Sequence, residues 1–168
     1  DINVKMRYFI DLEEKLKYLV NEDYYDGEFL KKYQFKFIKK MFKLAYGEDF
    51  RFPSFMSASK FYSGYALKSR DGKELLEKYE DRIVTTALYL ADGDEVLAEK
   101  AVKYIIEALQ PATPTFLNSG KKARGELVSC FKLAMDDTMN SIAENIGYCL
   151  ELSRLGGGVG VLLTDLRP

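Results

Sequence analysis

The chain holds two cysteines, and Cys130 is the one whose surroundings favour chemistry. It lies in a strand predicted over residues 126–135, where neighbours such as Ser129 and Cys130 face opposite sides. A thiol that faces an enclosed site can donate a hydrogen or a proton and can form a disulfide with a facing thiol. The commoner alternative for a lone cysteine is burial as a small hydrophobe, and the strand alone leaves both open. Cys149, on an apolar helix face, is most simply a packing residue.

A second candidate for chemistry is the turn at residues 136–139, between the end of this strand and the start of the next predicted helix. Ligands commonly bind at such positions in open α/β units. Free N–H groups at the helix start can bind an anion, and the Asp137 carboxylate can accept a hydrogen bond from a ribose hydroxyl. The alternative is that Asp137 only caps the helix, and spacing does not separate the two.

Two further features attract attention but have simpler explanations. The glycines of residues 156–160 follow a helix and precede a strand, whereas a dinucleotide-binding loop follows a strand and opens a helix. Three consecutive glycines instead indicate a close approach of the backbone to a ligand or another element. Four lysines at positions 36, 39, 40 and 43 share one helix side, which is more typical of a solvated face than of a site for an anionic partner.

Composition excludes several classes of protein. With 168 residues, 47% hydrophobic and 30% charged, the chain has the balance of a folded globular protein. No apolar run approaches the roughly 20 residues of a membrane span, and the first residues lack the apolar core of a signal peptide, so no membrane partner is expected. Two cysteines outside any CxxC pair predict a cytoplasmic protein with free thiols. The absence of His excludes His-based triads and most zinc sites, and a net charge of -1 argues against nucleic-acid binding.

The elements that must position these residues are helices first and one β-α-β unit afterwards. Apolar periodicity predicts helices over residues 11–20, 27–46, 74–91 and 95–109, with residues 92–94 as a helix-hairpin connection. Residues 111–115 are predicted to be extended, because each residue before a proline is pushed out of the α region.

The second part of the chain reads as strand, crossover helix and strand. The strand at 126–135 is followed by a helix over residues 138–155, with Met139, Ile142, Ile146, Cys149 and Leu150 on one face, and by a short strand at 159–163. We therefore predict a helical domain over residues 1–110 and the start of an α/β domain over 111–168. Two parallel strands need more neighbours to be stable, so the sheet is expected to be incomplete.

Five collinear segments resemble a known family over nearly the whole chain. They resemble the large (catalytic, α) subunit of class I ribonucleotide reductase, most closely class Ib. Each motif alone is modest, but five in this order and spacing are specific. The segments are Phe50-Arg51-Phe52-Pro53-Ser54-Phe55-Met56-Ser57-Ala58, Tyr79-Glu80-Asp81-Arg82, Thr113-Pro114-Thr115-Phe116-Leu117-Asn118, Leu127-Val128-Ser129-Cys130-Phe131 and Leu155-Gly156-Gly157-Gly158-Val159.

The resemblance implies a mainly α N-terminal domain followed by a ten-stranded α/β barrel. This chain would then hold the helical domain and the first β-α-β unit of the barrel. Cys130 matches the family's strand cysteine that helps to reduce the ribose 2′ carbon and ends as half of a disulfide. Thr113, Ser129 and Gly158 match positions that hold the substrate nucleotide.

The resemblance also implies an allosteric site and a dimer contact. Asp137 matches the residue that binds the ribose of the specificity effector, a deoxynucleoside triphosphate or ATP. Thr138 and Met139 lie beside it, and Arg167 matches the basic residue that meets the effector's phosphates. The helix over residues 138–155 would lie in the family's homodimer interface.

The rest of the family's active site lies beyond the positions matched here. The radical cysteine, the partner reducing cysteine and the recharging cysteine pair all belong to later parts of the α subunit, and the metal-radical cofactor resides on the β subunit. We therefore expect part of a ribonucleoside-diphosphate reductase α subunit that is inactive alone. The alternative is a non-catalytic module that binds nucleotide effectors or another subunit, and an inactive relic is a third possibility.

Overall fold

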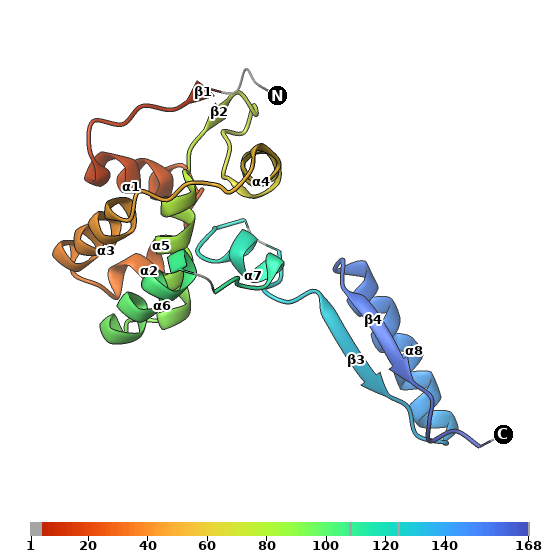
Figure 1. Ribbon diagram of the computed structural model, residues 1–168. Coiled ribbons are helices and arrows are strands. Elements are labelled where there is room, and N and C mark those ends of the chain that lie inside the picture. Colours follow the sequence, from red (N-terminus) through yellow and green to blue (C-terminus); the bar gives the residue numbers. More distant parts are fainter. Residues whose placement is uncertain (1–4, 108, 124, 168) are drawn as a thin grey trace. The chain divides into compact units, whose positions relative to one another are not determined.

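The computed structural model describes residues 5–107, 109–123 and 125–167, and its contacts divide the chain into two compact units (Figure 1). The first unit, Asp1–Arg124, is helical, and the second, Gly125–Pro168, is one β-α-β unit. This order of a helical part and then a β-α-β unit confirms the predicted fold class in outline. The domain boundary expected at residues 110 and 111 stays a prediction, and helix α7 (Thr113–Asn118), just after it, packs in the first unit.

Helix α5 (Tyr79–Ala91) is the centre of the first unit, because nine of its thirteen residues are buried. It is followed by α6 (Glu95–Glu107), and the connection runs through Asp92 and Gly93 at φ of 49° and 103°. Left-handed residues of this kind end one helix and redirect the chain, so the expected hairpin connection is confirmed. Helices α2 (Gly27–Lys31), α3 (Phe35–Gly47) and α7 also pack against α5.

The remaining elements of the first unit are short. Strands β1 (Lys5–Met6) and β2 (Glu74–Leu75) pair in parallel. Helix α1 (Leu12–Asn21) forms where the periodicity predicts it, and Asp11 caps it by accepting a hydrogen bond from the Glu14 N–H at 2.8 Å. Helix α4 (Phe55–Lys60) continues directly into a π-helix, η1 (Phe61–Tyr65).

The single helix predicted over residues 27–46 is wrong, since the chain forms α2 and α3 with a break at residues 32–34. Tyr33 turns into the core at this break. Its hydroxyl donates to the Leu88 carbonyl at 2.8 Å and accepts from the Gly93 N–H at 2.8 Å. These buried hydrogen bonds tie the break to the end of α5, which the apolar periodicity alone does not encode.

Helix α5 starts later than the residue-74 start that the periodicity predicts, because residues 74 and 75 form strand β2. Asp81 accepts a hydrogen bond from the Lys78 N–H at 2.7 Å and so marks the true start of the helix. Helix α6 reaches Glu107, and the next residue lies outside the described ones.

The extended segment predicted at residues 111–115 is also wrong, since helix α7 begins at Thr113 with Pro114 in its first turn. Proline fits there because the first N–H groups of a helix have no intrahelical partner, so its missing donor costs nothing. Of the predicted segment, only residues 111 and 112 stay outside regular structure.

The second unit consists of β3 (Cys130–Ala134), α8 (Met139–Arg154) and β4 (Gly158–Leu162), with the two strands parallel and Cys130 in register with Gly158. Strand β3 is shorter than predicted, beginning at residue 130 rather than 126. Burial alternates along both strands, and the half-buried side chains form the face covered by α8. These side chains are Phe131, Leu133, Val159 and Val161.

Candidate functional site

Cys130 and Gly158 begin the two parallel strands and lie side by side on the sheet face opposite to α8. The Gly158 N–H donates to the Ser129 carbonyl at 2.7 Å, which fixes the two strand starts together. The Ser129 hydroxyl lies 3.9 Å from the Cys130 sulfur. Three of the predicted active-site residues therefore meet at one edge of the second unit.

The Cys130 thiol is exposed in the described structure. It is therefore not buried as a small hydrophobe within its own unit, as the alternative would require. Helices form the outer ring of an α/β barrel, so in the barrel that the resemblance implies the face without α8 would be the inward-facing one. A thiol on that face can act as a hydrogen donor to a ligand inside the barrel. Cys149 is half-buried on α8, in keeping with a packing role.

Gly157, just before β4, lies at a point where the chain has no room for a side chain. A Cβ at this position would lie 2.6 Å from the Phe131 ring and 3.0 Å from the Leu152 carbonyl oxygen. Gly156 has φ of 87° and ends α8, as expected for a helix C-terminal glycine. The predicted close approach is therefore confirmed for Gly157, whose neighbours are the protein's own Phe131 ring and Leu152 carbonyl, but not for Gly156 or Gly158.

Asp137 and Arg167 form an ion pair, with Arg167 Nε 3.0 Å from Asp137 Oδ2. Thr138, not Asp137, caps α8, because its hydroxyl accepts a hydrogen bond from the Ser141 N–H at 3.2 Å. The alternative role of Asp137 as helix cap is therefore wrong, and its carboxylate pairs with Arg167 instead. Met139, the first residue of α8, is 77% exposed.

The predicted effector residues therefore gather at the opposite end of the strands from Cys130. Asp137 and Thr138 follow the last residue of β3, and Arg167 follows β4. Thr113 lies in the first unit, where the Tyr65 hydroxyl is 3.5 Å from its own hydroxyl. The predicted substrate-binding residues are therefore divided between the two units, with Thr113 in the first and Ser129, Cys130 and Gly158 in the second.

The apolar stripe expected on one face of α8 divides between two faces. Ile142 and Cys149 are half-buried toward the strands, beside the buried Asn145. Met139, Ile146 and Leu150 are 77%, 55% and 69% exposed and form a separate stripe. The second stripe leaves apolar side chains in water within the described structure.

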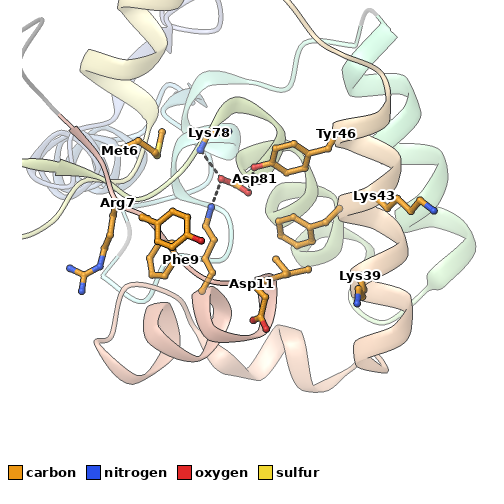
Figure 2. Close-up of a pocket in the computed structure, with 13 residues that line it drawn as sticks. Met6, Arg7, Phe9, Asp11, Lys39, Lys43, Tyr46, Lys78 and Asp81 are labelled. Carbon is orange, nitrogen blue, oxygen red and sulfur yellow. Dashed lines mark hydrogen bonds and ion pairs between the residues drawn. The ribbon is translucent and has the colours of Figure 1, made fainter.

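A cavity of about 660 Å³ in the first unit was not predicted (Figure 2). At its wall, the Asp81 carboxylate accepts hydrogen bonds from the Lys15 ammonium at 2.5 Å and the Tyr46 hydroxyl at 2.8 Å. Five basic side chains and two acidic ones contribute to the lining, so its charge favours an anion. The basic residues are Arg7, Lys15, Lys39, Lys43 and Lys78.

The lysines of α3 are thus divided between different surroundings. Lys39 and Lys43 line the cavity, whereas Lys40 pairs with Glu99 at 2.6 Å. The sequence signal for the cavity was weak, because residues 6–11 along its edge belong almost entirely to no regular element.

Within the described ranges, no helix is both long and apolar enough to cross a bilayer. The described His, Cys, Asp and Glu side chains also form no group of three or more that could hold a metal ion.

Comparisons with known proteins cover the chain in three consecutive pieces. Residues 1–50 match the family described as ribonucleotide reductase N-terminal, residues 51–124 match ribonucleotide reductase, all-alpha domain, and residues 128–168 match ribonucleotide reductase, barrel domain. The last two assignments agree with the helical unit and the β-α-β unit of the structure.

Individual relatives give the same result. The ribonucleoside-diphosphate reductase subunit alpha of Bacillus subtilis (strain 168) is 53% identical over 99% of this chain and 24% of its own length. The Bacillus subtilis NrdEB subunit alpha is also 53% identical, over 99% of this chain and 15% of its own length. The subunit alpha of Mycoplasma pneumoniae is 47% identical over 99% and 23%. The chain thus spans about a quarter or less of these relatives.

Proposed function

Because the chain belongs to the ribonucleotide reductase large-subunit family, we propose that it forms part of a class I, most closely class Ib, ribonucleoside-diphosphate reductase α subunit. In this role it contributes the first strands of the barrel and the helical domain before them. The observation that carries the proposal is the meeting of Cys130 and Gly158 on the sheet face opposite to α8, next to Ser129, whose carbonyl accepts a hydrogen bond from the Gly158 N–H.

Cys130 is proposed to act as one of two reducing thiols. Reduction of the ribose 2′ carbon removes the 2′ hydroxyl as water, and the two electrons come from two thiols that become a disulfide. This chain supplies one of the two, and a later part of the α subunit supplies the other. Thr113, Ser129 and Gly158 are proposed to hold the substrate nucleotide.

The opposite end of the strands is proposed to bind the specificity effector, a deoxynucleoside triphosphate or ATP. Asp137 accepts a hydrogen bond from the effector's ribose, and Arg167 meets its phosphates. Thr138 and Met139 line the same turn. The supporting observation is that Asp137 and Arg167 lie 3.0 Å apart although 30 residues separate them in sequence.

The proposed partners follow from the same family. The exposed stripe of α8 forms a homodimer contact, and the remainder of the α subunit completes the barrel. A separate β subunit generates the radical with its own metal-radical cofactor. The 168 residues alone are expected to be inactive, since they hold only one of the required thiols.

A complementation experiment tests the proposal. The chain is mixed with the remaining portion of an α subunit, from one of the relatives above, and with its β subunit, and reduction of a ribonucleoside diphosphate is measured. Cys130→Ser should abolish the activity, whereas Cys149→Ser, a half-buried cysteine on α8, should retain it. Unchanged activity with Cys130→Ser would show that the role given to this thiol is wrong.

The alternative is a non-catalytic module that binds a nucleotide effector or another α subunit. It is favoured by one observation: the Asp137–Arg167 pair and the exposed stripe of α8 both lie in the second unit and need no reducing thiol. Nucleotide binding without any activity in the complementation experiment would support this alternative.

A further inference from the structure

A fully buried ion pair lies in the core of the first unit. Arg82 Nη1 donates to Glu77 Oε1 at 3.1 Å, and both side chains are 0% exposed. The Glu77 carboxylate also accepts from the Tyr25 hydroxyl at 2.5 Å and the Leu67 N–H at 2.9 Å. Burial alone would raise the pKa of Glu77, but Arg82 and then Lys121 lower it below its ordinary value, so the carboxylate is charged at neutral pH.

The second terminal nitrogen of Arg82 points to a different element. Its Nη2 donates to the carbonyl of Ser119, the buried residue that ends helix α7. The next residue is held as well, since the Asp26 N–H donates to the Gly120 carbonyl at 2.9 Å. Arg82 therefore links the start of α5 to the end of α7 with one planar group, which a single guanidinium can do because its donors form a fixed fork.

Helix α7 depends on such contacts because it has only six residues. Isolated helices shorter than about 12 residues are marginal in water. Its other anchors are Phe116, which is 2% exposed and packs against the rings of Tyr65 and Tyr79, and the contact of 3.5 Å between the Tyr65 and Thr113 hydroxyls. Thr113 is the first residue of this helix, and Ser119 follows its last.

We infer that Arg82 is a positioning residue that holds α7 through Ser119, so that Thr113 at the other end of the helix is set for the substrate nucleotide. The inference rests on the proposed role of Thr113 in substrate binding. With a rise of about 1.5 Å per residue, the six residues of α7 span roughly 9 Å, so a displacement of the helix at Ser119 also displaces Thr113 at its other end. A misplacement of about 1 Å at a substrate contact can cost up to ~10²-fold in rate.

The test uses Arg82→Lys in the complementation assay. Lysine keeps the charge beside Glu77, but its single ammonium replaces the planar fork whose two nitrogens serve Glu77 and Ser119 separately. We expect KM for the ribonucleotide to rise about ten-fold, with a smaller change in kcat, as misplaced binding groups produce. Hydrogen exchange should become faster at the backbone N–H groups of residues 116–119, at the C-terminal end of α7 and just after it.

The matched control is Tyr33→Phe, which removes a buried hydrogen bond from Tyr33 to Leu88, near the opposite end of helix α5 from Arg82. It should lower Tm without a change in KM or in exchange of α7. An unchanged KM in Arg82→Lys, or an equal rise in KM in Tyr33→Phe, would overturn the inference.

Two further variants keep the result decisive. If Arg82→Lys does not fold, Glu77→Gln/Arg82→Met removes the Ser119 contact together with both charges of the buried Glu77–Arg82 pair, and the same rise in KM is expected. Thr113→Val separates the two proposals. If it raises KM while the Arg82 variants do not, only the positioning role fails. If Thr113→Val leaves KM unchanged, its role in substrate binding is wrong, and the positioning inference fails with it.

Discussion

Arg167 Nε lies 3.0 Å from Asp137 Oδ2, so the segment after β4 is joined to the turn before α8. The Arg167 side chain is 80% exposed and that of Asp137 is 33% exposed. Exposed ion pairs of this kind contribute about 1 kcal/mol or less to stability. A nucleotide that offers a phosphate to one partner and a hydroxyl to the other can therefore replace the pair at little cost.

Asp137→Ala should weaken the binding of dTTP to the chain about ten-fold or more, because a hydrogen bond to a charged group contributes about 1.5–3 kcal/mol. The free energy of unfolding should change by about 1 kcal/mol or less. Titration calorimetry measures the affinity. Asp165→Ala, an exposed carboxylate on the same segment as Arg167, is the charge-matched control and should bind as the unsubstituted chain does. Absence of binding in all three proteins would rule out an effector site in this chain by itself.

Glu77 should make the first unit sensitive to acid. Its pKa in the folded state lies below 4.5, so its contribution to stability is complete above pH 4.5 and is lost as the pH falls through the folded-state pKa. Each unit of depression corresponds to about 1.4 kcal/mol. Urea unfolding between pH 2 and 7 should show a smaller acid loss for Glu77→Gln than for the unsubstituted chain.

Glu99 is the internal comparison for that experiment. Hydrogen bonds from Lys40 and Lys103 lower the pKa of this partly exposed carboxylate to about 2, so it titrates at the acid end of the same range. Glu99→Gln should change the pH dependence much less, since exposed pairs are screened by solvent. An identical effect of both substitutions would contradict the special role of the buried pair.

Two glycines of the second unit should respond to alanine in opposite directions. Gly147 lies within α8, and among the described residues no atom beyond its own stretch of helix comes within 4 Å of where an alanine methyl group would lie. Gly147→Ala should therefore stabilise the unit by about 0.5–1 kcal/mol. Gly157→Ala places its methyl group 2.6 Å from the Phe131 ring and should destabilise it by about 1–3 kcal/mol. Thermal unfolding followed by circular dichroism measures both. A stabilising Gly157→Ala would show that β4 does not approach β3 as described.

Leu150→Lys should weaken self-association of the chain, because Leu150 is 69% exposed in the apolar stripe of α8. The control is Tyr148→Lys, since Tyr148 is 55% exposed but lies about 160° further around the helix. Sedimentation at increasing concentration should show the Leu150 variant as monomeric where the Tyr148 variant associates. Equal association of the two would exclude this stripe as the dimer contact.

The apolar pattern of the sequence predicts the type of most helices and strands well. It misses breaks and helix starts that depend on long-range contacts. Helix α8 and strand β4 begin within one residue of the predicted positions. The break at Tyr33 and the late start of α5 depend on partners far away in the chain, Leu88 for the former and strand β1 for the latter. Local periodicity holds no information about such partners.

The residues of the candidate site were also predictable only in part. The motif order led to Ser129, Cys130 and Gly158, and the strand register places them together. The pairing of Asp137 with Arg167 could not be derived from spacing, because the turn geometry at Thr138 decides which residue caps α8. Arg82 was visible only as part of a motif, and its two acceptors are revealed by the fold.

Strands β3 and β4 pair only with each other among the described residues, so each has one edge of unpaired N–H and C=O groups. Such edges are templates to which further strands add, and when they stay open they favour edge-to-edge aggregation. When the chain is purified by itself, these open edges are therefore exposed to pairing with other copies of the chain. The yield of soluble protein should therefore depend on the order of mixing. Co-folding the chain with the remaining barrel strands should give more soluble protein than adding those strands afterwards.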